Sequence, residues 1–117
     1  MRIRDVISPT LCVRCDEPSG LTLHRMRISG IGHLIITESR NIIGVASEKD
    51  LERACATNAD APVGDVVTEV PVLDADAQVK DAADVMRFRK VGCVPVLDHD
   101  VIAGVVTIET VLGLIGR

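Results

Sequence analysis

The spacing of apolar residues in the second half of the chain predicts both helices and strands. An apolar stripe at helical spacing, formed by Val79, Ala82, Ala83 and Met86, predicts a helix over about residues 77–89. Three short runs rich in β-branched residues, VPVL, GCVPVL and VIAGVV, predict strands, and the polar turn DHD between the last two predicts a hairpin. With a last helix beginning after Thr107, the predicted order is strand, helix, strand, strand, helix.

The first half follows the same plan. Its predicted strands are LCVRC, GHLIIT and NIIGVA, and its predicted helices cover about residues 20–29 and 48–56. Pro18, Ser19 and Gly20 occupy the start of the first of these helices and are poor helix formers. We therefore expect that helix to begin late.

The two halves align with each other without a gap. A shift of sixty residues pairs residues 1–57 with 61–117, and most aligned positions keep their polarity. The identical pairs are Asp5/Asp65, Val6/Val66, Asp16/Asp76, Met26/Met86, Arg27/Arg87, Gly32/Gly92, Ile42/Ile102, Gly44/Gly104 and Val45/Val105. We interpret the chain as a duplication, with repeats at 1–60 and 61–117 joined by a linker at 56–62. Each repeat alone is too small for a secure core, so an α+β fold with the repeats packed about a pseudo-twofold axis is expected.

A short motif closes each repeat, GVASEKD at 44–50 and GVVTIET at 104–110. Ser47 is expected to cap the following helix, and Asp50 three residues later completes the pattern of a capping box. The same residues also suit a ligand, because a helix N-terminus attracts phosphate and a carboxylate can accept both hydroxyls of a ribose. Thr107 keeps the cap, whereas Thr110 has no carboxylate. Gly44 is expected to allow the close approach of a strand or a ligand.

This arrangement of elements and motifs resembles a tandem CBS domain pair, also called a Bateman module. The resembling segments are RDVISP, SGIGHLIIT and IIGVASEKDLERA, and the resemblance extends over essentially the whole chain. It implies a regulatory module that binds AMP, ADP, ATP, S-adenosylmethionine or sometimes NAD in clefts between repeats. Such modules relay ligand occupancy to an enzyme, a channel or a transporter, and they are not themselves catalysts. A ribose at Asp50 is part of that implication.

The resemblance also implies further ligand-binding positions. Residues at the start of the first strand of each repeat would contact the base, and residues of the central strands would line the cleft. Lys49 could meet phosphates in place of the basic residue that Gly32 and Gly92 replace. The full set of implied ligand-binding residues is Thr10, Leu11, His33, Ile35, Ser47, Lys49, Asp50, Val70, Pro95 and Thr107. On an apolar strand, the default interpretation of His33 is an interior histidine without a ligand, and the ligand role comes second.

Composition narrows the class of protein further. The chain has 117 residues, a formal net charge of -4 and a single aromatic residue, Phe88, which argues against a nucleic-acid partner. No apolar run approaches the roughly 20 residues of a membrane span, and the first residues lack the apolar core of a secretory signal, so a cytoplasmic chain is expected. No nucleophile and base lie at a spacing that indicates catalysis. A ligand-free module that forms homodimers remains the alternative.

The cysteines offer a third hypothesis, a thiol-based metal or redox sensor. Cys12 and Cys15 form a C-x-x-C pattern, and Cys55 and Cys93 would complete a set of four thiols. The repeat argues against a sensor, because Cys12, Cys15 and Cys55 align with apolar residues of the second copy. We therefore expect these three cysteines to be small residues of the core. Cys93 aligns with His33 of the central strand, and no metal ligands are assigned.

Overall fold

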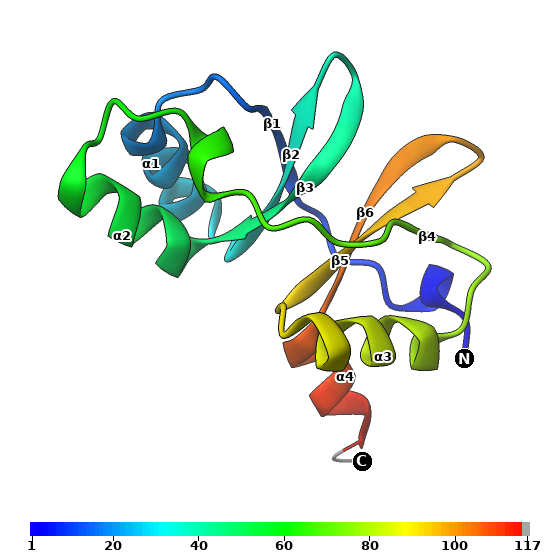
Figure 1. The fold of residues 1–117 in the computed structure, drawn as a ribbon. Coiled ribbons are helices and arrows are strands. Elements are labelled where there is room, and N and C mark those ends of the chain that lie inside the picture. The colour runs from blue at the N-terminus through cyan, green and yellow to red at the C-terminus, as the bar shows by residue number, and fades with distance from the viewer. Residues whose placement is uncertain (116–117) are drawn as a thin grey trace. The chain divides into compact units, whose positions relative to one another are not determined.

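The computed structural model describes residues 1–115, so the last two residues of the expected second repeat lie outside the described part. The chain forms two compact units. The first unit is Thr10–Glu69, and the second unit combines Met1–Pro9 with the chain from Val70 onward (Figure 1). Each unit is an α+β structure with one three-stranded sheet and two α-helices, which confirms the predicted fold class.

The first unit contains the elements in the predicted order. They are β1 (Leu11–Arg14), α1 (Ser19–Ser29), β2 (His33–Glu38), β3 (Asn41–Ser47), α2 (Glu48–Thr57) and the 3-10 helix η2 (Val63–Val66). The sheet order is β1-β2-β3, with β1 parallel to β2 and β2 antiparallel to β3.

The second unit repeats this topology with the order β4-β5-β6. Its elements are the 3-10 helix η1 (Ile3–Asp5), β4 (Leu73–Asp74), α3 (Val79–Arg89), β5 (Cys93–Asp98), β6 (Val101–Thr107) and α4 (Ile108–Ile115). The strand predicted at 70–73 is wrong in its position, because β4 has only two residues, Leu73 and Asp74. Pro71 has no backbone N–H to give to a sheet, which explains why the strand starts after it.

The expected late start of α1 is also wrong, since α1 begins at Ser19, the equivalent of the first residue of α3. Pro18 lies just before the helix, where its missing N–H costs nothing and its carbonyl accepts a hydrogen bond from the Thr22 backbone. The first turn is stabilised from outside, because the backbone N–H groups of Ser19 and Gly20 donate to carbonyls of residues 61 and 59. Contacts distant in sequence therefore outweigh the low helix propensity of this turn.

Each unit has its own aliphatic core between the sheet and the helices, and the two cores use equivalent positions. Leu34 and Ile36 of β2 point to the helices in the first unit, as Val94 and Val96 of β5 do in the second. The first core also contains Val13, Leu23, Met26, Ala46, Leu51 and Val63, and the second contains Ile3, Ala75, Ala82, Met86, Val106 and Val111.

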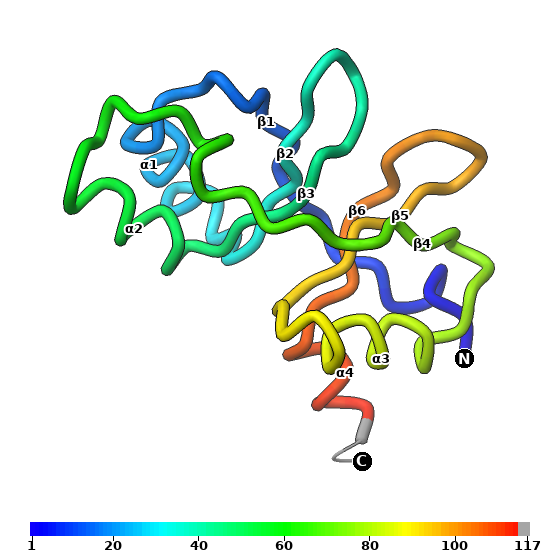
Figure 2. The backbone as a smooth tube through the Cα atoms, viewed as in Figure 1, coloured from blue at the N-terminus to red at the C-terminus, as the bar shows by residue number. Residues whose placement is uncertain are grey.

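The segment that leads into each repeat packs on the other copy. These lead segments run from η1 to Ser8 for the first repeat and from η2 to Thr68 for the second. Val63 of η2 lies in the core of the first unit, and Ile3 of η1 lies in the core of the second. The compact units therefore differ from the sequence repeats at 1–60 and 61–117. The expected linker at 56–62 is part of the first unit, where its backbone carbonyls accept hydrogen bonds from the start of α1. The chain passes between the units after Pro9 and again after Glu69 (Figure 2).

Backbone hydrogen bonds to the edge strands β3 and β6 hold these lead segments in place. Val45 of β3 exchanges two N–H···O bonds of 2.9 Å with Thr68, and Val105 of β6 exchanges bonds of 2.8 and 3.1 Å with Ser8. Gly44 and Gly104 lie directly beside these contacts, where a Cβ atom would overlap the carbonyl oxygen of Thr68 or Ser8. The glycine of the closing motif thus permits a close approach between backbones, as expected.

Candidate functional site

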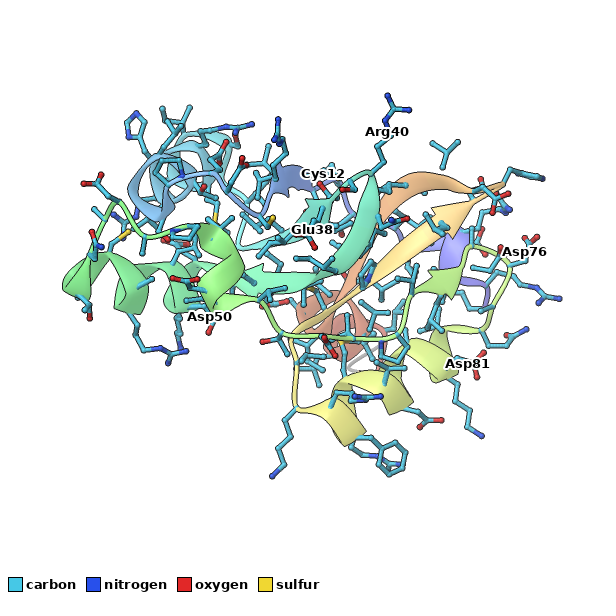
Figure 3. The ribbon with its side chains drawn as sticks, turned by 45° about the horizontal axis from the view of Figure 1, so that its top comes forward. Cys12, Glu38, Arg40, Asp50, Asp76 and Asp81 are labelled. Atoms are coloured by element: carbon cyan, nitrogen blue, oxygen red, sulfur yellow. The ribbon has the colours of Figure 1, made fainter. Side chains whose placement is uncertain are left out.

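The closing motif of the first repeat forms the expected helix cap at the start of α2. The Asp50 backbone N–H donates to Ser47 Oγ at 3.2 Å, and the Ser47 backbone N–H donates to Asp50 Oδ2 at 2.9 Å. These two bonds make a complete capping box and fix the direction of the Asp50 carboxylate. Asp50 is labelled at the beginning of this helix in Figure 3.

The second oxygen of the carboxylate has a weaker partner. Arg53 Nη2 donates to Asp50 Oδ1 at 2.6 Å, but the Arg53 side chain is 76% exposed whereas that of Asp50 is 27% exposed. Exposed ion pairs of this kind contribute little free energy, so Arg53 can be displaced at small cost. One carboxylate oxygen is therefore held by the backbone, and the other can change partners.

The equivalent position in the second unit keeps the cap and loses the charge. The Thr110 backbone N–H donates to Thr107 Oγ1 at 3.3 Å, and the two hydroxyl oxygens lie 3.1 Å apart. Thr107 caps α4 as expected, and Thr110 offers a hydroxyl where Asp50 offers a carboxylate.

Other predicted residues of the first unit lie at the same end of the sheet as Ser47. His33, the first residue of β2, pairs directly with Ser47, and the Thr10 hydroxyl donates to the His33 carbonyl at 2.9 Å. Leu11 follows in β1, and Ile35 lies on the face of β2 opposite to the helices. The exposed side chain of Lys49 lies in the first turn of α2.

The remaining predicted residues belong to the second unit. Thr107 pairs with Cys93, Pro95 pairs with Val105, and Val70 precedes β4 as a half-buried residue. A cavity of about 420 Å³ lies between the lead segment and α4, lined in part by Ile7, Ser8 and Thr110.

Asp5, which the sequence analysis did not assign to a site, also lines this cavity. The signal that could have indicated it was its identity with Asp65 in the repeat alignment. That identity does not place Asp5 near the start of α4, because the exchange of lead segments becomes visible only in the structure.

Shifted pKa values occur away from the capped helices. Arg4 donates to Asp98 at 2.9 Å and lowers the pKa of that carboxyl, and it also donates to Asp76 at 2.9 Å. The pKa of Cys12 is raised by partial burial, which disfavours the thiolate although part of the residue is exposed.

No disulfide joins the four cysteines, which all lie within residues 1–115 and are scattered over several elements. Cys12 lies in β1 (Figure 3) and is exposed rather than part of the core, because it is on the face of the strand opposite to the buried Val13. The Cys15 thiol approaches a carboxylate oxygen of Glu38 at 3.9 Å, Cys55 packs beside the first core, and Cys93 is buried in β5. Within residues 1–115, no three side chains of the His, Cys, Asp and Glu types lie close enough together to hold a metal ion. In the same part of the chain, every helix is too short or too polar to cross a membrane.

Comparison with known proteins identifies this fold. The structure is similar to the CBS domain pair of protein MJ0100 in complex with 5'-methylthioadenosine and S-adenosyl-L-methionine, with a TM-score of 0.84, 23% identity, and coverage of 99% of this chain and 96% of that one. It is similar to the CBS-domain containing protein ATU1752 from Agrobacterium tumefaciens, with a TM-score of 0.79, 19% identity, and coverage of 97% and 98%. It is also similar to Hypoxic Response Protein I with two coordinated zinc ions, with a TM-score of 0.76, 23% identity, and coverage of 97% and 98%. At these identities the likeness establishes the fold.

The family follows from the sequence of the second half. The family model of the CBS domain matches residues 63–117, whereas a search of curated proteins finds no match. Residues 63–117 thus match the CBS domain family, and the whole chain has the fold of a CBS domain pair. The resemblance drawn from the sequence is confirmed.

Proposed function

We propose that this chain is a regulatory module that binds an adenosine-containing ligand, either an adenine nucleotide or S-adenosylmethionine, at the start of α2. The observation that supports the proposal is the way in which the two oxygens of the Asp50 carboxylate are hydrogen-bonded. The Ser47 N–H orients Oδ2 from a half-buried position, and among residues 1–115 the only partner of Oδ1 is an exposed arginine. A ribose diol can replace that arginine and donate to a carboxylate that is already oriented.

Neighbouring groups give the rest of the ligand its contacts in this proposal. The first turn of α2 presents backbone N–H groups and a favourable dipole to phosphate, with Lys49 as an additional cation. Thr10, Leu11 and His33 lie at the adjoining end of the sheet, where they would contact the base. The complex of the structurally similar MJ0100 with two adenosine compounds supports the ligand class.

Regulation would follow from linkage between ligand binding and the folded state. A ligand that binds only the native chain stabilises it by about 2.7 kcal/mol when its concentration is 100 times Kd. We propose that a partner enzyme or transporter responds to this ligand-bound, stabilised form. In this proposal the chain acts as a homodimer and catalyses no reaction itself.

A ligand panel with thermal unfolding tests the proposal. AMP, ADP, ATP and S-adenosylmethionine are each titrated to millimolar levels, and at least one is expected to raise Tm in a dose-dependent way. D50A should abolish the shift, because the ribose loses its acceptor. R53A is the matched control and should retain the shift, since it removes only the competing partner of Oδ1. A panel that leaves Tm unchanged, or an equal shift in D50A, would contradict the proposal.

A ligand-free interaction module is the second candidate, and one observation favours it. The capping box and Arg53 already satisfy Asp50 without a ligand, as a purely structural residue requires. This candidate predicts no Tm shift with any member of the panel, together with self-association in sedimentation experiments that is indifferent to all four ligands.

A further inference from the structure

The hairpin between β2 and β3 ends in a small basic cavity. A two-residue turn, Ser39 and Arg40, connects the strands with left-handed backbone angles, φ of 50° and 69°. Arg14, the last residue of β1, lies beside Thr37 in the parallel pairing of the sheet. These four residues line a cavity of about 330 Å³, and Figure 3 shows the Arg40 side chain extending from the end of the hairpin.

The cationic groups at this cavity are poorly neutralised. Arg40 has no hydrogen-bond or ion-pair partner among residues 1–115. Arg14 is paired only with Asp16, at 3.2 Å, and the side chains are 81% and 68% exposed, so the pair is weak. The Ser39 hydroxyl, which is exposed, adds a donor that no other group in the described residues uses. Two guanidinium groups and a hydroxyl are thus available to one ligand.

The second repeat shows that the fold does not require this charge. Its hairpin has the same turn, with φ of 50° at His99 and 63° at Asp100. The positions equivalent to Arg14 and Arg40 are Asp74 and Asp100, so the sign of the charge is reversed. Since the two hairpins have the same backbone with opposite charge, the arginines are not there to form the turn.

We propose that the end of the β2–β3 hairpin binds an oxyanion of the phosphate class. The guanidinium groups of Arg14 and Arg40 would donate hydrogen bonds to the anion, because their geometry matches that of a phosphate group. The Ser39 hydroxyl would be a third donor. This site is separate from the proposed adenosine site. His33 of β2 and its partner Ser47 of β3 lie at the other end of the hairpin, roughly 17 Å away at the usual rise per strand residue.

Titration of the ¹⁵N-labelled full chain with inorganic phosphate, then pyrophosphate, at constant ionic strength tests the site. Saturable shifts are expected for the backbone amides of residues 37–41. R14Q and R40Q should each weaken the apparent affinity at least tenfold. The matched control is R89Q, an exposed arginine at the end of α3, which should leave the affinity unchanged. Shifts that do not saturate, or that persist unchanged in R14Q and R40Q, would overturn the proposal.

Two further arms separate the sources of the phosphate group and the two proposed sites. Cosedimentation with phosphatidylcholine vesicles, with and without phosphatidic acid, assigns the ligand to a lipid headgroup if binding requires both phosphatidic acid and Arg40. Binding of free phosphate or pyrophosphate without vesicle binding assigns it to a soluble phosphate compound. D50A should keep the phosphate response, so failure of the adenosine proposal would leave this result intact. Loss of the response in D50A would contradict the proposed separation.

Discussion

The starts of α2 and α4 are the most informative pair of regions in the molecule. Both follow an outer strand, both are capped by a hydroxyl, and both lie after a glycine that permits a close backbone contact. They differ at the third helical residue, which is Asp50 in one and Thr110 in the other. The second unit forms its capped helix without a carboxylate, so the fold does not demand one there. This difference is the reason to assign Asp50 a role in binding.

The same comparison separates what the duplicated fold requires from what each copy adds. The glycine and the cap recur with the same geometry, and their contacts are with backbone atoms. Charges differ freely between copies, as Arg40 and Asp100 show at the hairpin ends. Features common to both units therefore indicate structure, and a charge found in one unit alone is not required by the shared fold.

The largest effect is expected where the units are alike, at the two glycines. G44A and G104A each place a methyl group against a backbone carbonyl, of Thr68 and of Ser8 respectively. Neither carbonyl can move without breaking the bonds of the lead segment, so each substitution should lower the free energy of unfolding by about 3 kcal/mol. Urea denaturation measures this directly.

Gly32 provides the control for these two substitutions, because nothing lies within 4 Å of a Cβ built there. G32A should change the free energy of unfolding by less than about 1 kcal/mol. A large loss in G44A with none in G104A would show that the lead segments do not contribute equally to the two units.

An exchange of residues between the units should move the proposed ribose site. D50T gives α2 the sequence of α4 at this position, and we expect at least a tenfold loss of adenosine-ligand affinity, consistent with about 1.5–3 kcal/mol for a hydrogen bond to a charged group. T110D in the D50T background places a carboxylate beside the cavity of the second unit and should restore part of that affinity. Isothermal titration calorimetry with the ligand identified by the panel measures both effects.

Thermal unfolding without ligand separates binding from folding in this exchange. D50T keeps a side chain that can bond Ser47, as Thr110 bonds Thr107, so most of the native stability should remain. If D50T instead unfolds the chain while ligand affinity persists in the folded fraction, Asp50 is a capping residue only.

The sequence predicted the local structure well and the long-range pairing less well. The stripe at Met86 and the cap at Ser47 are set by neighbouring residues, so periodicity and spacing were sufficient to predict the helices. The start of α1 was mispredicted because its first turn is stabilised by carbonyls forty residues away in sequence. Local propensity contains no information about such bonds.

The exchange of lead segments escaped prediction for a related reason. Ile3 and Val63 are equivalent positions with equivalent apolar character, so each segment could pack on either copy as far as its sequence shows. Only the tertiary structure reveals that Val63 completes the first core and Ile3 the second. Asp5 was missed as a cavity residue because its position depends on this exchange.

The smallest effect is expected from an ion pair that only the second unit possesses. Arg4 anchors the lead segment to Asp98, whereas the equivalent residues of the first unit are Gly64 and Glu38. The arginine lowers the pKa of Asp98 in the folded chain. As the pH falls below about 4, the unfolded chain takes up a proton at this residue first, so the stabilisation present at neutral pH is lost in acid.

D98N should therefore flatten the acid side of the stability profile. Its urea midpoint should be lower than that of the parent chain at pH 7, and the two should converge towards pH 3. E38Q is the matched control, and its stability profile should stay parallel to that of the parent chain. Within the described residues, the only hydrogen bond to the Glu38 side chain comes from the Cys15 thiol. A parallel curve for D98N would mean that the lead segment of the second unit is held by backbone pairing and core packing, as in the first unit.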